Sequence, residues 1–192
     1  MKTIKGTITE QNLLKAFAGE SQARNRYSFF ASIAKKEGYE QIAATFIETA
    51  DQEREHAKRF FDFLEGGYAT IHEACYPAGK CGTTADNLLA AAMGEKEEWD
   101  ILYPTFAQKA EEEGFMAVAS AFRNIASVEA EHERRYLQLL SRITDGDFFH
   151  RDGEIWWQCR NCGYIIKAEN APKTCPSCLH PKGYFEPMKR NY

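Results

Sequence analysis

The sequence has no surplus of positive charge and no long apolar run. Its 24 Lys and Arg residues stand against 28 Asp and Glu residues, which leaves a net charge of −4. Nucleic-acid-binding proteins usually carry a basic surplus, so this class is disfavoured. No apolar stretch approaches the roughly 20 residues of a membrane span, and the segment MKTIKGTITEQN has no apolar signal-peptide core. We therefore expect no nucleic-acid partner, no membrane association and a cytoplasmic location.

Six cysteines are present, and in a reducing compartment such residues bind metals more often than they form disulfides. Four of them lie at or after position 159, whereas Cys75 and Cys81 lie in a loop-like stretch. We interpret Cys75 and Cys81 as free thiols, and a redox-responsive pair is the alternative.

Helical periodicity dominates the chain from about Thr9 to Ser141. Gly38 and Gly114 each follow a charged stretch, as glycines at helix C-caps do. The pattern predicts helices over residues 9–37, 39–65, 84–113 and 115–144, joined by a short, a long and a short connection. This indicates a mainly α protein, a ferritin-like four-helix bundle with one long crossover.

The composition changes after the last predicted helix, to aromatics, glycines, prolines and cysteines. We therefore expect two domains. Residues 1–148 would form the bundle, and residues 149–192 a small four-cysteine domain with short β-strands.

The two helix pairs repeat each other. One constant offset in numbering places Tyr27 on Tyr103, Glu53 on Glu129 and His56 on His132. The same offset applied to Glu20 overshoots Glu95 by one position. One extra residue therefore lies between Glu95 and Tyr103. Single-residue insertions in helices often appear as π-bulges near functional sites, so we expect a π-bulge there.

Each predicted helix has a glutamate in the middle of its apolar stripe, namely Glu20, Glu53, Glu95 and Glu129. A helical glutamate usually faces water, but here this would have to hold four times against the periodicity. Buried ion pairs are the other plain reading, yet too few cations share these faces, although Arg24 can approach. An uncompensated buried carboxylate costs several kcal/mol, and four exceed the roughly 5–15 kcal/mol net stability of a domain. A cation is therefore predicted at the centre.

The spacing of these residues indicates which cation. Glu53 and Glu129 are each followed three residues later by a histidine, His56 and His132, so each pair lies on one helix face. Two such pairs plus one glutamate from each of two other helices are typical of di-iron or di-manganese bundles. Oxygen ligands with one imidazole per metal favour iron or manganese over structural zinc.

Glu98 lies three residues after Glu95 and adds a surplus carboxylate, whose counterpart in the first half is Gln22 or Ala23. A surplus ligand permits exchange, and a solvated Glu98 is the alternative. The candidate ligands are Glu20, Glu53, His56, Glu95, Glu98, Glu129 and His132. Tyr27 and Tyr103 are either core aromatics or hydrogen-bond donors to ligating carboxylates.

The C-terminal cysteines form two C-x-x-C pairs, Cys159 with Cys162 and Cys175 with Cys178. Two such pairs predict a tetrahedral four-thiolate site, for which zinc and iron both remain open. Gly163 follows the first pair, where the backbone has to turn and point N–H groups at sulfur.

Taken together, these motifs resemble the rubrerythrin family over essentially the whole chain. AGESQARNRY, ADQEREHAKR, GEKEEWDILYPTFA and EAEHERRY resemble its four helix segments, and CRNCGY with CPSC resembles a shortened rubredoxin domain that binds one iron. The resemblance implies an oxo-bridged di-iron centre bridged by Glu53 and Glu129. Glu20 would bind one iron, and Glu95 with His132 the other. The first iron would exchange Glu98 for His56 on reduction.

The resemblance also implies an activity, a peroxidase that reduces hydrogen peroxide to water in oxidative-stress defence. An external reductase or rubredoxin-type donor would supply electrons through the four-cysteine iron, with Glu98, His56, Tyr27 and Tyr103 as catalytic residues. A homodimer or higher homo-oligomer is expected. The alternatives are a ferroxidase or iron-storage protein, and a non-enzymatic zinc-ribbon interaction protein. The resemblance assigns no role to Cys75 and Cys81.

Overall fold

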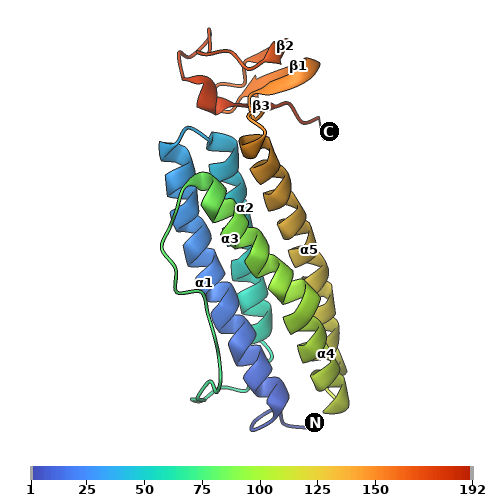
Figure 1. Ribbon diagram of the computed structural model, residues 1–192. Helices are drawn as coiled ribbons and strands as arrows, with labels where there is room; N and C mark the ends of the chain where they lie inside the picture. Colours follow the sequence, from blue (N-terminus) through green and yellow to red (C-terminus); the bar gives the residue numbers. More distant parts are fainter. Residues whose placement is uncertain (1, 191–192) are drawn as a thin grey trace.

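The computed structural model describes residues 2–190 and shows a helical bundle with a small sheet domain at one end (Figure 1). The bundle comprises α1 (Ile8–Lys36), α2 (Glu40–Phe61), α3 (Thr84–Glu97), the π-helix η1 (Glu98–Leu102), α4 (Tyr103–Glu112) and α5 (Met116–Thr144). The small domain comprises β1 (His150–Cys159), β2 (Ile165–Asn170), the 3-10 helix η2 (Lys182–Tyr184) and β3 (Phe185–Pro187). The predicted fold class, a ferritin-like bundle with a small four-cysteine domain, is confirmed.

The helix ends follow the glycine signals at two of the predicted positions. Gly38 and Gly114 have φ angles of +82° and +80°, which a residue without Cβ adopts readily. The N–H of Tyr39 then donates to the carbonyl of Ala34 at 2.8 Å, which closes the first helix. The second helix was predicted to reach residue 65, but it ends at Phe61. The chain leaves it through a turn in which the N–H of Leu64 donates to the carbonyl of Phe61.

The third predicted helix is divided by η1, and the expected π-bulge is confirmed. The N–H of Tyr103 donates to the carbonyl of Glu98, five residues earlier, instead of the usual four. The extra residue of the second half is thus absorbed within one turn. This turn begins at Glu98, the carboxylate that has no acidic counterpart in the first half.

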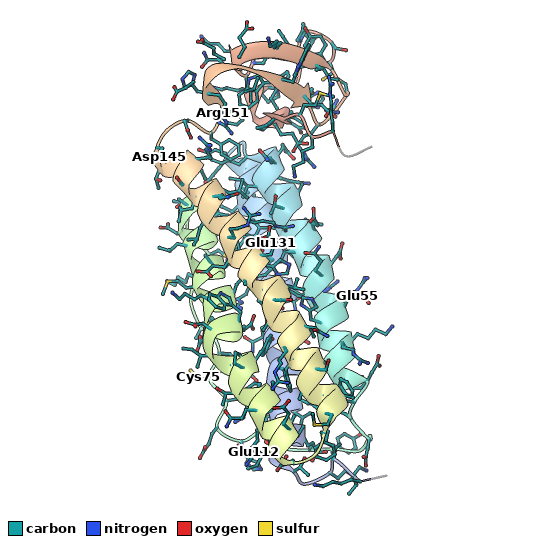
Figure 2. The ribbon with its side chains drawn as sticks, turned by 90° about the vertical axis from the view of Figure 1, so that its right-hand side faces the viewer. Glu55, Cys75, Glu112, Glu131, Asp145 and Arg151 are labelled. Carbon is teal, nitrogen blue, oxygen red and sulfur yellow. The ribbon has the colours of Figure 1, made fainter. Side chains whose placement is uncertain are left out.

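Two apolar clusters lie on either side of the predicted glutamate layer. One contains Tyr27, Phe46 and Tyr136, and the other contains Leu13, Phe60, Phe122 and further apolar residues. The glutamates between them, Glu20, Glu53, Glu95 and Glu129, are at most 1% exposed. By contrast, Glu55 and Glu131 lie on the outer surface, as Figure 2 shows. Water is therefore excluded from the four stripe carboxylates.

The crossover between α2 and α3 runs along α1 (Figure 1). Gln11 donates from Nε2 to the carbonyl of Thr70 at 2.9 Å, and the Tyr76 hydroxyl donates to the carbonyl of Lys15 at 3.0 Å. These bonds hold the crossover against the first half of α1.

The small domain is a three-stranded antiparallel sheet in the order β2-β1-β3. It lies against the turn between α1 and α2, where Tyr39 packs on Phe148 and Phe149 with ring centroids 5.1 and 6.0 Å apart. Gly183 approaches so closely that a Cβ atom there would lie 2.3 Å from the Gly38 carbonyl oxygen. The division into residues 1–148 and 149–192 stays a prediction.

Within residues 2–190, none of the helices combines the length and apolar character that crossing a membrane requires.

Candidate metal centres

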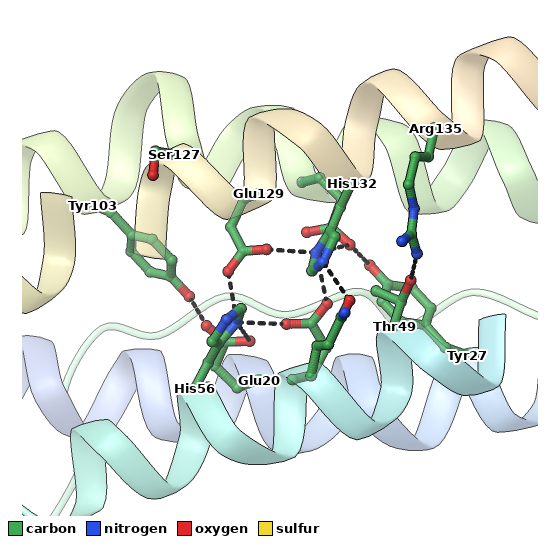
Figure 3. A network of polar contacts seen from close by, with 12 residues as sticks. Glu20, Tyr27, Thr49, His56, Tyr103, Ser127, Glu129, His132 and Arg135 are labelled. Atoms are coloured by element: carbon green, nitrogen blue, oxygen red, sulfur yellow. Dashed lines mark hydrogen bonds and ion pairs between the residues drawn. The ribbon is translucent and has the colours of Figure 1, made fainter. Parts of the chain in front are cut away.

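The four stripe glutamates and the two histidines meet inside the bundle (Figure 3). They form two groups, whose potential ligand atoms lie within 4.8 Å of one another. The first group contains Glu20, Glu53, His56 and Glu129, and the second contains Glu53, Glu95, Glu129 and His132. Glu53 and Glu129 belong to both groups. This is the geometry of two adjacent metal positions with two shared carboxylates.

One imidazole faces each group through its Nδ1 atom. His56 Nδ1 lies 2.8 Å from Glu129 Oε1 and 3.0 Å from Glu53 Oε2. His132 Nδ1 lies 2.7 Å from Glu129 Oε2 and 3.2 Å from Glu53 Oε1. The two Glu-x-x-His motifs thus present equivalent atoms to the centre from α2 and α5.

The donor atoms fit a pair of cations. One buried oxygen of Glu20 and one of Glu95 have no hydrogen-bond partner among the described residues, and the oxygens of Glu53 and Glu129 lie against the two imidazoles. Such orphaned atoms cost free energy unless something binds them. The set offers four carboxylates and two imidazoles, ligand types that suit iron or manganese. The residues therefore fit the di-metal centre that the sequence predicts.

Without metal, protons have to balance the buried charge. Burial, together with the charges of Glu53 and Glu129, raises the pKa values of Glu20 and Glu95 well above the usual range. Burial opposes the charging of His56, but hydrogen bonds with Glu129 and Glu53 outweigh it and raise its pKa to about 10. The same balance raises the pKa of His132 to about 9. Metal binding therefore has to displace protons.

Tyr27 and Tyr103 each donate a hydrogen bond to a glutamate from the opposite half of the repeat. Tyr27 Oη lies 2.5 Å from Glu95 Oε1, and Tyr103 Oη lies 2.5 Å from Glu20 Oε1. Of the two readings of these tyrosines, the hydrogen-bonding one therefore describes the structure. Both rings are also buried in the apolar clusters.

Gln52 is a contact of the site that sequence reasoning missed. Its Oε1 atom lies 2.9 Å from His132 Nε2, the ring nitrogen that points away from the centre. The equivalent position in the second half of the repeat holds Val128, which has no polar group to offer His56. The only signal in the sequence was a polar residue directly before Glu53, which also occurs on any solvated helix face. His132 therefore has a side-chain partner for its outer nitrogen that position 128 does not provide for His56.

Glu98 lies outside both groups of potential ligands. Its side chain lines a cavity of about 270 Å³ between α1, η1 and the crossover. Burial raises the pKa of Glu98 well above the usual range, and the charges of Glu129 and Glu53 raise it further. The structure thus places His56 at the first metal position and Glu98 away from it.

The four C-terminal cysteines converge as the motif predicts. Their sulfurs lie within 4.8 Å of one another, with Cys159 and Cys178 3.7 Å apart and Cys162 and Cys175 3.6 Å apart. A tetrahedron with metal–sulfur bonds of about 2.3 Å has edges of roughly 3.8 Å, so the separations fit one metal ion.

Backbone groups support the thiolates. Burial raises the pKa of Cys159 to about 12, and the N–H groups of Cys162 and Asn161 oppose this rise. The N–H of His180 lowers the pKa of Cys178 to about 6. Gly163 has a φ angle of +78°, as the turn after the first pair requires. Cys159 and Cys175 are buried, whereas Cys162 is exposed, so the site is reachable from one side.

Cys75 and Cys81 are exposed free thiols, as predicted. Cys75 also belongs to the lining of the cavity that holds Glu98.

Two family models match the chain. The one described as Rubrerythrin matches residues 11–140, and the one described as Rubrerythrin, rubredoxin-like domain, matches residues 157–186. The rubrerythrin of Porphyromonas gingivalis is 67% identical over 191 residues, which cover 100% of this chain and 95% of that protein. The rubrerythrin of Nitratidesulfovibrio vulgaris is 51% identical, and 100% of both chains is covered.

Solved structures give the same picture. A structure of nigerythrin in a mixed-valence state has a TM-score of 0.63 and 34% identity, over 97% of this chain and 89% of that chain. A Desulfovibrio desulfuricans bacterioferritin with a diiron site has a TM-score of 0.63 over 71% of this chain and 80% of that chain. At 24% identity, this second likeness shows the fold alone.

The bundle thus carries a ferritin-like di-iron site with carboxylate and histidine ligands, and the small domain carries a rubredoxin-like four-cysteine site. Both family matches and the full-length relatives show that the chain belongs to the rubrerythrin family, a family of iron-containing redox enzymes.

Proposed function

We propose that this protein is a peroxidase that reduces hydrogen peroxide to water with electrons from an external donor. The observation that carries the proposal is the presence of two redox-capable sites in one chain, a di-iron site and a four-thiolate site. An iron-storage protein on the same bundle has no need of the second site. The reaction consumes two electrons and two protons for each peroxide and releases two waters.

The geometry supports a role for each candidate ligand in the two groups, and the resemblance adds the exchange of Glu98. Glu53 and Glu129 would bridge the two irons, because their oxygens belong to both ligand groups. Glu20 with His56 would bind one iron, and Glu95 with His132 the other. When bound, the two irons supply the two electrons that cleave the O–O bond. Glu98 would exchange with His56 as the charge of the centre changes, and nearby carboxylates or water would supply the protons.

Tyr27 and Tyr103 would hold the terminal carboxylates in place. Each phenol donates to one oxygen of Glu95 or Glu20, which leaves the other oxygen for the metal. Such outer contacts orient ligands and adjust their basicity. The tyrosines would thus act through the two glutamates.

The electron route favours a second copy of the chain. The small domain contacts the bundle near Tyr39, at the start of α2, whereas Glu53 lies far along the same helix. At a rise of about 1.5 Å per residue, the path from Tyr39 to Glu53 is about 21 Å long. A head-to-tail homodimer would bring the four-cysteine site of one chain closer to the di-iron site of the other. An external reductase or rubredoxin-type donor would approach from the side of Cys162, the exposed cysteine.

The test is anaerobic stopped-flow oxidation of the fully reduced protein, with hydrogen peroxide and dioxygen compared at equal concentration. We expect peroxide to oxidise the di-iron site faster, at one peroxide per site. Faster oxidation by dioxygen, with ferric iron retained in the bundle, would instead identify a ferroxidase. Zinc in the four-cysteine site of protein isolated from iron-replete cells would favour the non-enzymatic zinc-ribbon reading.

A further inference from the structure

The cavity beside the di-iron site breaks the internal repeat in two places. The offset that pairs Tyr27 with Tyr103 also pairs Gln22 with Glu98 and Arg26 with Leu102. The residues of these two pairs, Gln22, Glu98, Arg26 and Leu102, all line the cavity. The first half therefore contributes an amide and a cation, whereas the second half contributes a carboxylate and an apolar side chain. The unmatched cation and the unmatched carboxylate share one cavity.

The cavity is built from two facing helix stripes under a cover. From α1 come Lys15, Gly19, Gln22 and Arg26, which are spaced four, three and four residues apart and so share one face. Glu98 and Leu102 come from η1, Tyr76 and Pro77 come from the crossover, and the carboxylates Glu73 and Glu97 also belong to the lining. A Cβ atom at Gly19 would lie 3.6 Å from Glu98 Oε1 and 3.8 Å from the Tyr76 ring. Glycine at this position leaves room for the carboxylate.

Arg26 supplies a positive charge in this space. It lines the same cavity as Glu98, and a cation beside a buried carboxylate favours the charged form of that carboxylate. The Nε atom of Arg26 is buried and has no hydrogen-bond partner among the described residues. Lys15 also lines the cavity, and its backbone carbonyl accepts the hydrogen bond from the Tyr76 hydroxyl.

We propose that Arg26 is a positioning residue that provides the countercharge for the Glu98 carboxylate while it is withdrawn from the metal. This rests on the proposed exchange of Glu98 for His56. Arg26 would then favour the arrangement seen here, with His56 at the first metal position and Glu98 in the cavity. In the proposed exchange this arrangement is the reduced one, so loss of Arg26 should make the di-iron site harder to reduce.

The test is a double-mutant cycle on the iron-loaded full-length protein, with the midpoint potential of the di-iron site as the readout. In otherwise native protein, Arg26→Leu should shift the reduction equilibrium about tenfold toward the oxidised form, which is about 59 mV for a one-electron step. Arg26→Lys should keep most of the wild-type midpoint potential, because the positive charge remains. In an E98Q background, Arg26→Leu should have little effect, because the carboxylate that it balances is gone.

Arg24→Leu is the matched control. It removes an equal charge from α1, but Arg24 lines a different surface groove with Phe17 and Phe61. An equal shift in R24L, or an equal shift of R26L in the E98Q background, would overturn the proposal, because the charge would then act directly on the irons. An unchanged potential in R26L would overturn it too.

Iron content and thermal unfolding identify variants that fold, and Arg26→Gln replaces R26L if the leucine variant does not. A crystal structure of reduced R26L should show Glu98 back at the metal. Failure of the proposed function would be recognised by a different result. The wild-type protein would then react with peroxide no faster than with dioxygen.

Discussion

Tyr27 on α1 donates a 2.5 Å hydrogen bond to Glu95 on α3, so that each half of the repeat holds a carboxylate of the other. Tyr103 makes the reciprocal bond to Glu20. The glutamates on these two helices are thereby fixed across the bundle before any metal binds.

Replacing Tyr27 or Tyr103 by phenylalanine should weaken iron binding. The ring stays in its apolar cluster, but the buried carboxylate loses its donor, which costs roughly 1–3 kcal/mol. Iron affinity should fall about 10- to 100-fold, as measured by anaerobic Fe(II) titration. Tyr39→Phe is the control, because the Tyr39 ring packs on Phe148 and Phe149, away from the glutamates. Equal affinities in Y27F and Y39F would contradict the prediction.

Replacing Gln52 by leucine should loosen His132 and leave His56 unaffected. Gln52 is the partner of the outward nitrogen of His132, and loss of such a partner typically lowers metal affinity about 10- to 100-fold. Titration should then show one weakened iron position of the two. Val128→Ala, at the equivalent position of the other half, serves as the control. If both variants weaken binding equally, Gln52 has no special role.

The metal-free protein should lose stability as the pH rises. The folded-state pKa values of His56 and His132 are about 10 and 9, above the ordinary value of 6.5. Raised pKa values mean that the stabilisation is fully present below about pH 6.5 and is lost as the pH passes 9 and 10. The raised pKa values of Glu20 and Glu95 act in the same direction.

Urea unfolding of the metal-free protein at about pH 6, 8 and 10 measures this effect. A variant with both His56 and His132 replaced by glutamine should show a flatter dependence. Stability that rises from neutral to alkaline pH would contradict the assignment.

Cys162→Ser should abolish the function of the four-cysteine site and leave the di-iron site reactive. The variant should lose its iron–thiolate absorption and its turnover with an external donor, while the chemically reduced di-iron site still reacts once with peroxide. Cys75→Ser and Cys81→Ser are matched controls, because both thiols are exposed and lie outside the four-cysteine cluster. Loss of the single-turnover reaction in C162S would show that the two sites are not independent.

The same variant tests the proposed homodimer. Mixed with Glu53→Ala, which lacks a bridging carboxylate, C162S should regain turnover once subunits exchange. No recovery after verified exchange would favour electron transfer within one chain.

Much of this molecule follows from local pattern. The four helices follow from the helical periodicity and the glycine caps, and the π-helix follows from one unmatched residue between Glu95 and Tyr103. The Glu-x-x-His pairs and C-x-x-C pairs place their ligands within one turn of backbone, so neighbouring residues suffice to predict them. The early end of α2 at Phe61 was not predicted, because the apolar pattern continues past it through Phe63.

By itself, the sequence predicted a cation at the centre of the bundle, because burying four carboxylates without one would exceed the stability of the fold. Only the tertiary structure decided which partner each of them meets. Tyr27 bonds to Glu95 instead of Glu20, Gln52 bonds to His132 instead of His56, and Glu98 lies in a cavity beside Arg26. These contacts join different helices, so they depend on how the helices pack and on the rotation of each helix about its axis, which periodicity within one helix does not specify.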